Sequence, residues 1–174
     1  MDGPAAVRAE EAFKLIYAEA FAEPPYNETE DDVAAAFRRF PVQARNGAFR
    51  AVLARTPEGE PIGMAYGHNL GPDTVWWDEL TEPVPDDLRR EDGRRTFALR
   101  ELAVRGPWRG QGVARRMHET LLDGIGAERV LLNVHPENKA ASAAYRAWGY
   151  RKAGEARARG AGADLVDVML LDLR

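Results

Sequence analysis

The sequence has no cysteine, and only three of its 24 basic residues are lysines. The absence of cysteine excludes a disulfide framework, a thiolate metal site and a cysteine nucleophile within the chain, so thiol chemistry must come from a bound molecule. No apolar run of about eighteen residues occurs, and the segment MDGPAAVRAEEAF has no basic region followed by an apolar stretch. We therefore expect a soluble, cytoplasmic protein without a membrane segment. We ascribe the excess of arginine to a GC-rich bacterial genome.

The charge balance is slightly acidic, with 24 basic and 28 acidic residues and a net charge of −4. Such a chain has no broad basic surface for nucleic acid or for an anionic membrane, and a small anion would need a local site. The 174 residues show no break in composition. We expect a single domain over residues 1–174, and we predict no metal site.

Two helices are predicted in the first quarter of the chain. Apolar residues recur at three- and four-residue spacings over residues 13–21, and the PP pair that follows ends this helix. Thr29 and Asp32 approximate a capping box for a second helix, which Pro41 is expected to stop. Ahead of both, MDGPAAV offers at most a few extended residues.

The rest of the chain predicts an α/β fold. The turn-rich pentapeptide TPEGE joins two strands into a hairpin, and residues 71–93 are predicted to be an inserted loop with one short helix. The later order of strand, helix and strand implies a right-handed crossover and parallel pairing of ELAV with VLLNV. Strands are predicted at residues 48–55, 61–70, 96–104, 129–134 and 165–173, with helices at 113–125 and 138–148.

The stretch RGPWRGQGVARRMHETLL, residues 105–122, is typical of an anion site. It places Gly110 and Gly112 between a strand and a helix, where first-turn amides lack helical partners and can hold a phosphate. Arg109 can add a charge-assisted hydrogen bond, whereas Arg115 and Arg116 either reach the phosphate or face water. The alternative is that the glycines serve the turn geometry alone.

Two common phosphate motifs do not fit this stretch. A Walker loop requires lysine and a hydroxyl residue where the chain has Val113 and Ala114. A dinucleotide fingerprint requires a third small residue where the chain has Arg115, and it belongs to an early βαβ unit.

The residues here resemble the GNAT superfamily of N-acetyltransferases. The family motif Q/R-x-x-G-x-G/A matches Arg109, Gly112 and Ala114. Downstream, NKAASAAYRAWGY is similar to the family pattern N-x-x-A-x-x-x-Y-x-x-x-G-[FY], which it matches at Asn138, Ala141, Tyr145, Gly149 and Tyr150. The resemblance implies a mixed, largely antiparallel central sheet with parallel, splayed fourth and fifth strands and flanking helices. Family members usually begin with a strand, which is weak or missing here.

The resemblance also implies acetyl-coenzyme A (acetyl-CoA) as the acetyl donor. Its pyrophosphate would lie on the amides of residues 110–114, and its pantetheine arm would lie along residues 102–104, where it satisfies strand amides and carbonyls. Asn138 would both cap its helix and contact the donor. The residues assigned to the donor are Leu102, Ala103, Val104, Arg109, Gly110, Gln111, Gly112, Val113, Ala114, Asn138, Ala141 and Tyr145.

Acetyl transfer requires a neutral amine, and an alkylamine with a pKa of about 10.4 pays about 4.6 kcal/mol for it at pH 7. Glu101, on the strand of the donor site, is our first candidate for the base, with Asp78, Glu79 and His68 as weaker candidates. The alternative for Glu101 is a solvated strand carboxylate. Tyr145 matches the tyrosine that donates a proton to the leaving thiolate in many family members.

The proton donor role of Tyr145 is limited by acidity. Full proton transfer from a phenol of pKa about 10 to a thiolate of pKa about 8.5 is uphill by about 2 kcal/mol. Equally, Tyr145 can therefore donate a hydrogen bond to the developing thiolate, which solvent then protonates. A third interpretation of Tyr145 is aromatic packing alone.

The acceptor in this family usually lies near the loop between the first two helices and near the central strands. Clustered aromatics there are candidates for an apolar or cation-binding pocket, or for core and a dimer seam: Phe21, Tyr26, Tyr66, Trp76 and Trp77. The leading hypothesis is acetylation of a primary amine on a small molecule, by direct attack in a ternary complex. A protein N-terminus or lysine as acceptor, and a non-catalytic acyl-CoA-binding module, are the alternatives. We expect no nucleic-acid or membrane partner, and a monomer or homodimer.

Overall fold

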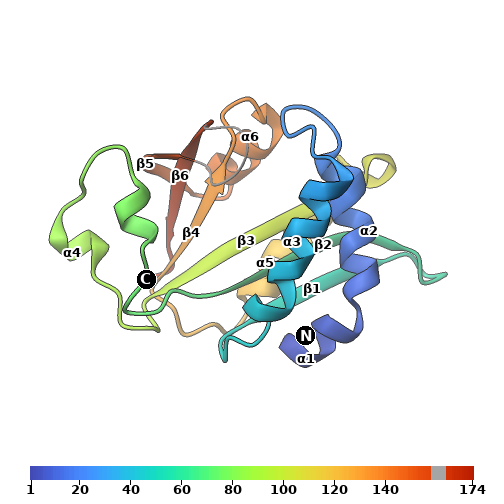
Figure 1. The fold of residues 1–174 in the computed structure, drawn as a ribbon, viewed down its shortest axis with the longest axis horizontal. Helices are drawn as coiled ribbons and strands as arrows, with labels where there is room; N and C mark the ends of the chain where they lie inside the picture. Colours follow the sequence, from blue (N-terminus) through green and yellow to red (C-terminus); the bar gives the residue numbers. More distant parts are fainter. Residues whose placement is uncertain (158–163) are drawn as a thin grey trace. The chain divides into compact units, whose positions relative to one another are not determined.

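The computed structural model describes residues 1–157 and 164–174 (Figure 1). The strands form one six-stranded sheet in the order β1-β2-β3-β4-β6-β5, with β3 and β4 parallel and the other neighbours antiparallel. This confirms the predicted α/β class and its parallel pair. The elements are α1 (Gly3–Arg8), α2 (Glu10–Phe21), α3 (Glu30–Gln43), β1 (Arg50–Arg55), β2 (Pro61–Asn69), the 3-10 helix η1 (Trp76–Glu79), α4 (Asp86–Arg89), β3 (Thr96–Val104), the 3-10 helix η2 (Gly106–Trp108), α5 (Val113–Leu122), β4 (Arg129–Val134), α6 (Lys139–Ala147), β5 (Arg151–Arg157) and β6 (Leu165–Asp172).

The chain divides into two compact units, residues 1–68 with 99–125 and residues 69–98 with 126–174. In the first unit, β1 and β2 pair from Arg50 and Gly67 to Arg55 and Pro61, as the hairpin prediction requires. Helices α2 and α3 lie side by side in front of these strands in Figure 1, and α5 lies behind them. The core between α2, α3 and the strands contains Phe13, Ile16, Tyr17, Val33, Phe37, Phe40, Met64 and Tyr66.

The first residues form helix α1 from GPAAVR, where the sequence offered at most a few extended residues. The side chain of Asp2 caps this helix by accepting a hydrogen bond from Ala5 N at 3.0 Å, and Pro4 suits a first turn. Met1 pairs with the outer side of β1, where Ala51 N donates to its carbonyl at 2.9 Å. The first strand of the described chain is therefore β1.

The prediction that Pro41 stops the second helix is wrong, since α3 continues to Gln43. Proline has no backbone N–H, so the helical hydrogen bond from residue 41 to the carbonyl four residues earlier is missing. The next turn keeps its bond from Ala44 N to Phe40 O at 2.9 Å, and Phe40 is fully buried. Packing of this face offsets the lost bond. The capping box is confirmed, with Thr29 N donating to Asp32 at 2.8 Å and Asp32 N to Thr29 at 3.3 Å.

The second unit contains a strand that we did not predict, β5. It pairs with β6 at the edge of the sheet, from Arg151 and Leu170 to Arg157 and Leu165. The sequence RKAGEAR lacks apolar alternation because an edge strand has to bury little of its surface. Lys152 crosses to β6 and binds Asp167 at 2.9 Å.

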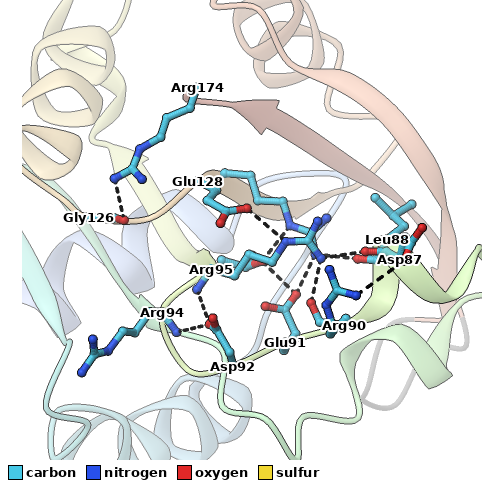
Figure 2. A network of polar contacts seen from close by, with 12 residues as sticks. Asp87, Leu88, Arg90, Glu91, Asp92, Arg94, Arg95, Gly126, Glu128 and Arg174 are labelled. Atoms are coloured by element: carbon cyan, nitrogen blue, oxygen red, sulfur yellow. Dashed lines mark hydrogen bonds and ion pairs between the residues drawn. The ribbon is translucent and has the colours of Figure 1, made fainter.

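The inserted segment 71–93 holds two short helices, η1 and α4, where one was expected. A buried network fixes its end to β3 and β4 (Figure 2). Arg129 donates to Glu91 at 2.9 Å and to Thr96 at 2.8 Å, and Trp77 donates to the same Glu91 oxygen at 3.0 Å. These bonds join the insertion to the sheet of its own unit.

Strand β3 contains an irregularity against β2. Leu70 N donates to Thr96 O and Arg105 N donates to Ile62 O, each at 2.9 Å. The interval 96–105 is one residue longer than the interval 62–70, whereas a regular antiparallel ladder has equal intervals. A β-bulge therefore lies within this part of β3, and bulges change the direction of the side chains beside them. Glu101 lies in this interval.

Candidate active site

The predicted anion-binding turn is formed at the start of α5. Gly110 and Gly112 have φ values of 73° and 77°, a left-handed conformation that glycine adopts without strain. Helix α5 begins at Val113, and its N-cap residue Gly112 supplies no capping side chain. The amides of the first turn therefore keep their capacity to bind an anion, and this turn fits a phosphate group.

The motif arginine of this turn is tied to the protein. Arg109 Nε donates to Val104 O at 2.8 Å, and its Nη1 lies 2.6 Å from Glu23. Arg116 folds back toward the turn, where its Nη1 lies 3.4 Å from Gln111 O. The sequence left open whether Arg115 or Arg116 reaches the phosphate. Arg116 lies near the loop backbone, whereas Arg115 pairs with Glu119 at 2.9 Å.

The strand residues assigned to the pantetheine arm lie beyond the parallel pairing. The register of β3 with β4 joins residues 96–98 to residues 129–131. Strand β3 continues through Leu102, Ala103 and Val104, of which Ala103 and Val104 are buried. Residues 102–104 therefore lie outside the pairing of β3 with β4. The predicted position of the pantetheine arm needs strand backbone of this kind.

The second motif occupies the start and the body of α6. Asn138 caps the helix as predicted, and its side chain accepts from Ala141 N at 3.2 Å. Tyr145 is 7% exposed, and its ring meets Trp148 and Tyr150 edge-on, with centroids 5.5 and 5.4 Å away. Burial raises the pKa of Tyr150, and the neighbouring Tyr145 adds to this. The aromatic contacts fix the ring plane of Tyr145.

The pKa of the Glu101 carboxyl is near neutral pH, as a general base requires. Burial, with a smaller contribution from the charge of Glu28, raises the pKa of its carboxyl from 4.5 to about 8, against the lowering effects of Arg100 and Arg39. Strongly perturbed carboxyls of this kind concentrate at functional sites. Glu101 therefore stays our prediction for the base.

The charge of Glu101 acts on two phenols of the first unit. Burial raises the pKa values of Tyr17 and Tyr66, and in both the charge of Glu101 is the next cause. Tyr17 also donates a hydrogen bond to Glu28 at 3.0 Å. Glu28 was not a candidate from the sequence, because it belongs to no motif and only the fold brings it near Glu101.

The weaker base candidates have other partners. His68 lies 3.1 Å from Arg100 Nε and 3.4 Å from Asn46 Nδ2. Asp78 forms an ion pair with Arg89. Glu79 lies beside Asp78 in η1, and these three residues stay weaker candidates for the base.

The aromatic candidates fall into separate groups. Phe21 and Tyr26 are half-buried beside Tyr17, with ring centroids 4.4 Å (Tyr17 to Phe21) and 4.9 Å (Phe21 to Tyr26) apart. Tyr66 is 3% exposed in the core of the first unit. Trp76 and Trp77 belong to the core of the second unit. Core packing therefore accounts for the two tryptophans, and Phe21 and Tyr26 remain the accessible pair.

Residues 1–157 and 164–174 contain no group of three or more His, Cys, Asp or Glu side chains that could hold a metal ion. Over the same ranges, no helix is long and apolar enough to cross a membrane.

Comparison with solved structures shows the same fold elsewhere. The ribosomal-protein-S18-alanine N-acetyltransferase from Escherichia coli is 21% identical over 94% of this chain and 86% of its own, with a TM-score of 0.59. Nourseothricin acetyltransferase is 20% identical over 74% of this chain and 67% of its own, with a TM-score of 0.56. A Salmonella typhimurium protein solved with its cofactor acetyl-CoA is 15% identical over 100% of this chain and 91% of its own, with a TM-score of 0.57.

No curated protein matches the sequence. The profile of the acetyltransferase (GNAT) family matches residues 10–150, which is most of the chain. Enzymes of this family use acetyl-CoA as co-substrate. The chain belongs to the GNAT family and is an acetyl-CoA-dependent acyltransferase.

Proposed function

We propose that the protein acetylates a primary amine on a small molecule, by direct attack of the amine on the thioester in a ternary complex. The observation that carries the proposal is Glu101, whose buried carboxyl has a pKa of about 8 beside Tyr17 and Tyr66. A base of this acidity suits an ammonium substrate, because the amine must lose a proton before it attacks.

The magnitude of the pKa shift matters for this proton transfer. Moving a proton from an alkylammonium with a pKa of about 10.4 to an ordinary glutamate with a pKa of about 4.3 is uphill by about 8 kcal/mol. With the carboxyl at about 8, the same transfer is uphill by about 3 kcal/mol. Burial of Glu101 therefore removes more than half of this cost.

The two sequence motifs carry the proposed contacts with the donor. The amides of residues 110–114 bind the pyrophosphate, with Arg109 and Arg116 as adjacent positive charges. The backbone of residues 102–104 aligns the pantetheine arm, and Asn138 and Ala141 contact the donor. Acetyl-CoA supplies the activated acetyl group as a thioester.

Tyr145 has the second chemical role in the proposal. Its hydroxyl donates a hydrogen bond to the sulfur as negative charge develops there, and solvent then supplies the proton. Its ring is held by Trp148 and Tyr150. A fixed donor of this kind stabilises the departing group without a change of shape during the reaction.

A protein N-terminus is the second candidate acceptor. It is favoured by the likeness to the Escherichia coli alanine N-acetyltransferase, which covers 94% of this chain. Small primary amines and short peptides with a free N-terminus separate the two acceptor classes when they are compared at equal concentration.

The test is release of coenzyme A (CoA) from acetyl-CoA with both panels, for the wild type, Glu101→Gln and Tyr145→Phe. The proposal expects turnover with small amines, a loss of kcat/KM of at least about 100-fold in Glu101→Gln, and a loss of about tenfold in Tyr145→Phe. Turnover with the peptides and not with the small amines would show that the acceptor is a protein N-terminus instead of a small molecule. Tight binding of acetyl-CoA without any turnover would indicate an acyl-CoA-binding module.

A further inference from the structure

Two acidic residues at the end of α2 bind two arginines of the segment that leads from β3 into α5. Glu19 lies in α2, and Glu23 follows one helical turn later, because the C-cap of α2 keeps helical backbone angles. Arg105 and Arg109 are also four residues apart and flank η2. Arg105 binds Glu19 at 2.6 Å, and Arg109 binds Glu23 at 2.6 Å. All four residues belong to the first unit, so the two pairs form a ladder within it.

The pair of Arg105 with Glu19 is fixed by further contacts. Arg105 Nε and Nη2 both donate to the Glu19 carboxylate, at 2.6 and 3.1 Å, and Nη1 donates to Glu60 and to Pro61 O, each at 2.9 Å. The guanidinium also lies 5.0 Å from the centre of the Trp108 ring. The Arg105 side chain is only 15% exposed, and most of its N–H groups are engaged. This pair therefore holds the end of β3 against α2.

The pair of Arg109 with Glu23 is built to open. The two side chains are 44% and 51% exposed, and Arg109 Nη1 donates to Glu23 Oε2. Exposed pairs of this kind contribute little to stability, since water can replace either partner. The separate bond from Arg109 Nε to Val104 O, at 2.8 Å, does not involve Glu23. The guanidinium can therefore stay beside the anion-binding turn when the carboxylate leaves.

A pyrophosphate on the amides of residues 110–114 would compete with Glu23 for Arg109. Two anions on one guanidinium repel each other, so one of them is displaced. The phosphate is also held by the first-turn amides of α5. The Glu23 carboxylate is half exposed and can turn into water at little cost. Glu23 is therefore the anion that leaves.

The backbone of Glu23 anchors the loop between α2 and α3. Its carbonyl accepts hydrogen bonds from Tyr26 N and Asn27 N, each at 3.1 Å, and Glu28 N closes the loop by donating to Phe21 O at 2.8 Å. Asn27 has a φ of 47°, a left-handed conformation that is uncommon outside glycine. The ion pair of the Glu23 side chain thus restrains the residue on which this loop closes.

We infer that Glu23 is a positioning residue for the donor: it holds Arg109 until the pyrophosphate replaces it, and its release loosens the loop between α2 and α3. The inference rests on the donor placement in the proposed function and goes beyond it by connecting the donor site to this loop. Coupling between two sites is reciprocal, so the restraint that Glu23 places on the loop also opposes donor binding.

Hydrogen exchange of the backbone amides of residues 26–28 measures the release. With saturating CoA, these amides in the wild type should exchange about two- to fivefold faster, as the loss of one exposed ion pair implies. Dephospho-CoA keeps the pyrophosphate and should have the same effect. Pantetheine has no phosphate and should leave the exchange unchanged.

Glu23→Gln removes the competing carboxylate. Without ligand, its loop amides should exchange about two- to fivefold faster than those of the wild type, and CoA should change them no further. Glu119→Gln is the matched control, since Glu119 forms an exposed pair with Arg115 of the same unit, and it should keep the wild-type response to CoA. A merely structural role of Glu23 would raise the ligand-free exchange but leave the response to CoA intact. Circular dichroism and the thermal midpoint identify any variant that does not fold.

The failure of this inference can be told apart from the failure of the proposed function. CoA that binds in a calorimetric titration without raising the exchange of the loop amides would overturn the inference and leave the donor site standing. An equal rise with CoA in the wild type and in Glu23→Gln would also overturn it. A rise that requires Glu23, in a protein that acetylates no small amine, would support the inference and overturn the proposed function.

Discussion

Arg109 Nη1 lies 2.6 Å from Glu23 Oε2, and this ion pair connects the anion-binding turn to the loop that follows α2. The same guanidinium donates through Nε to Val104 O at 2.8 Å, at the end of β3. Both side chains of the pair are about half exposed, so the pair contributes little to stability. Its consequence is electrostatic, because Glu23 offsets part of the positive charge that would attract a pyrophosphate.

Glu23→Gln should therefore strengthen the binding of CoA. Removing one nearby negative charge is expected to lower the Kd by about two- to fivefold at about 20 mM salt, and the gain should largely vanish at about 500 mM salt through screening. Calorimetric titration with CoA at both salt concentrations measures this. Glu119→Gln is the matched control, since Glu119 also pairs with an arginine of the same unit, Arg115. An equal gain in both variants would show that the effect comes from net charge alone.

Gly112→Ala should damage the donor site more than the stability of the fold. Alanine in the left-handed conformation costs about 1–2 kcal/mol, and relief of this strain would move the first amides of α5. The KM for acetyl-CoA is expected to rise by at least about fivefold, with a smaller relative change in kcat. Gly71→Ala is the control, because a Cβ there meets nothing within 4 Å and no left-handed angle is required. A normal KM in Gly112→Ala would exclude the turn as the pyrophosphate site.

Local chemistry explains what the sequence could predict. The capping residues Thr29 and Asn138, the hairpin turn and the helix after Gly112 each depend on neighbours within a few positions, and all formed as expected. The class of the sheet followed from the order of these elements. The motifs likewise pointed to the two segments that hold the predicted donor-site residues.

The misses depend on contacts that are distant in sequence. Glu28 became a candidate only because the fold brings Glu101 near it, and the edge strand β5 is defined by its pairing with β6. The continuation of α3 past Pro41 depends on the burial of Phe40. Trp77 was predicted either for an acceptor pocket or for the core, and it lies in a core and donates to Glu91.

Glu101 should make the protein less stable as the pH rises. Its carboxyl titrates at about 8 in the folded protein and near 4.5 when unfolded, so between these values the folded state holds the extra proton. The unfolding free energy therefore falls with increasing pH, and the stabilisation present below about pH 4.5 is lost as the pH passes through 8. Glu101→Gln removes this dependence.

The measurement is urea unfolding of the wild type and Glu101→Gln at pH 5 and pH 9. The advantage of the variant over the wild type should grow by at least about 1 kcal/mol between these pH values. Glu58→Gln, at an exposed position in the hairpin turn, should show no such growth. A pH-independent difference between Glu101→Gln and the wild type would contradict the raised pKa of Glu101, and with it the case for Glu101 as the base.

The ion pair of Glu91 and Arg129 should be the most sensitive polar contact of the second unit. Their side chains are 1% and 4% exposed, and Arg129 also donates to Thr96 and to Leu88 O (Figure 2). Glu91→Ala leaves the buried guanidinium without its counter-charge, which costs about 3–5 kcal/mol of unfolding free energy. Urea unfolding measures this loss.

The control for this prediction lies in the same segment. Arg90 pairs with Asp87 at 3.5 Å, but both side chains are largely exposed, so Arg90→Ala should cost less than about 1 kcal/mol. The double variant Glu91→Leu with Arg129→Met should recover part of the loss, because it removes both buried charges together. Equal losses in Glu91→Ala and Arg90→Ala would mean that burial does not distinguish the two pairs, and that the insertion is held to its sheet by apolar packing around Trp77 instead.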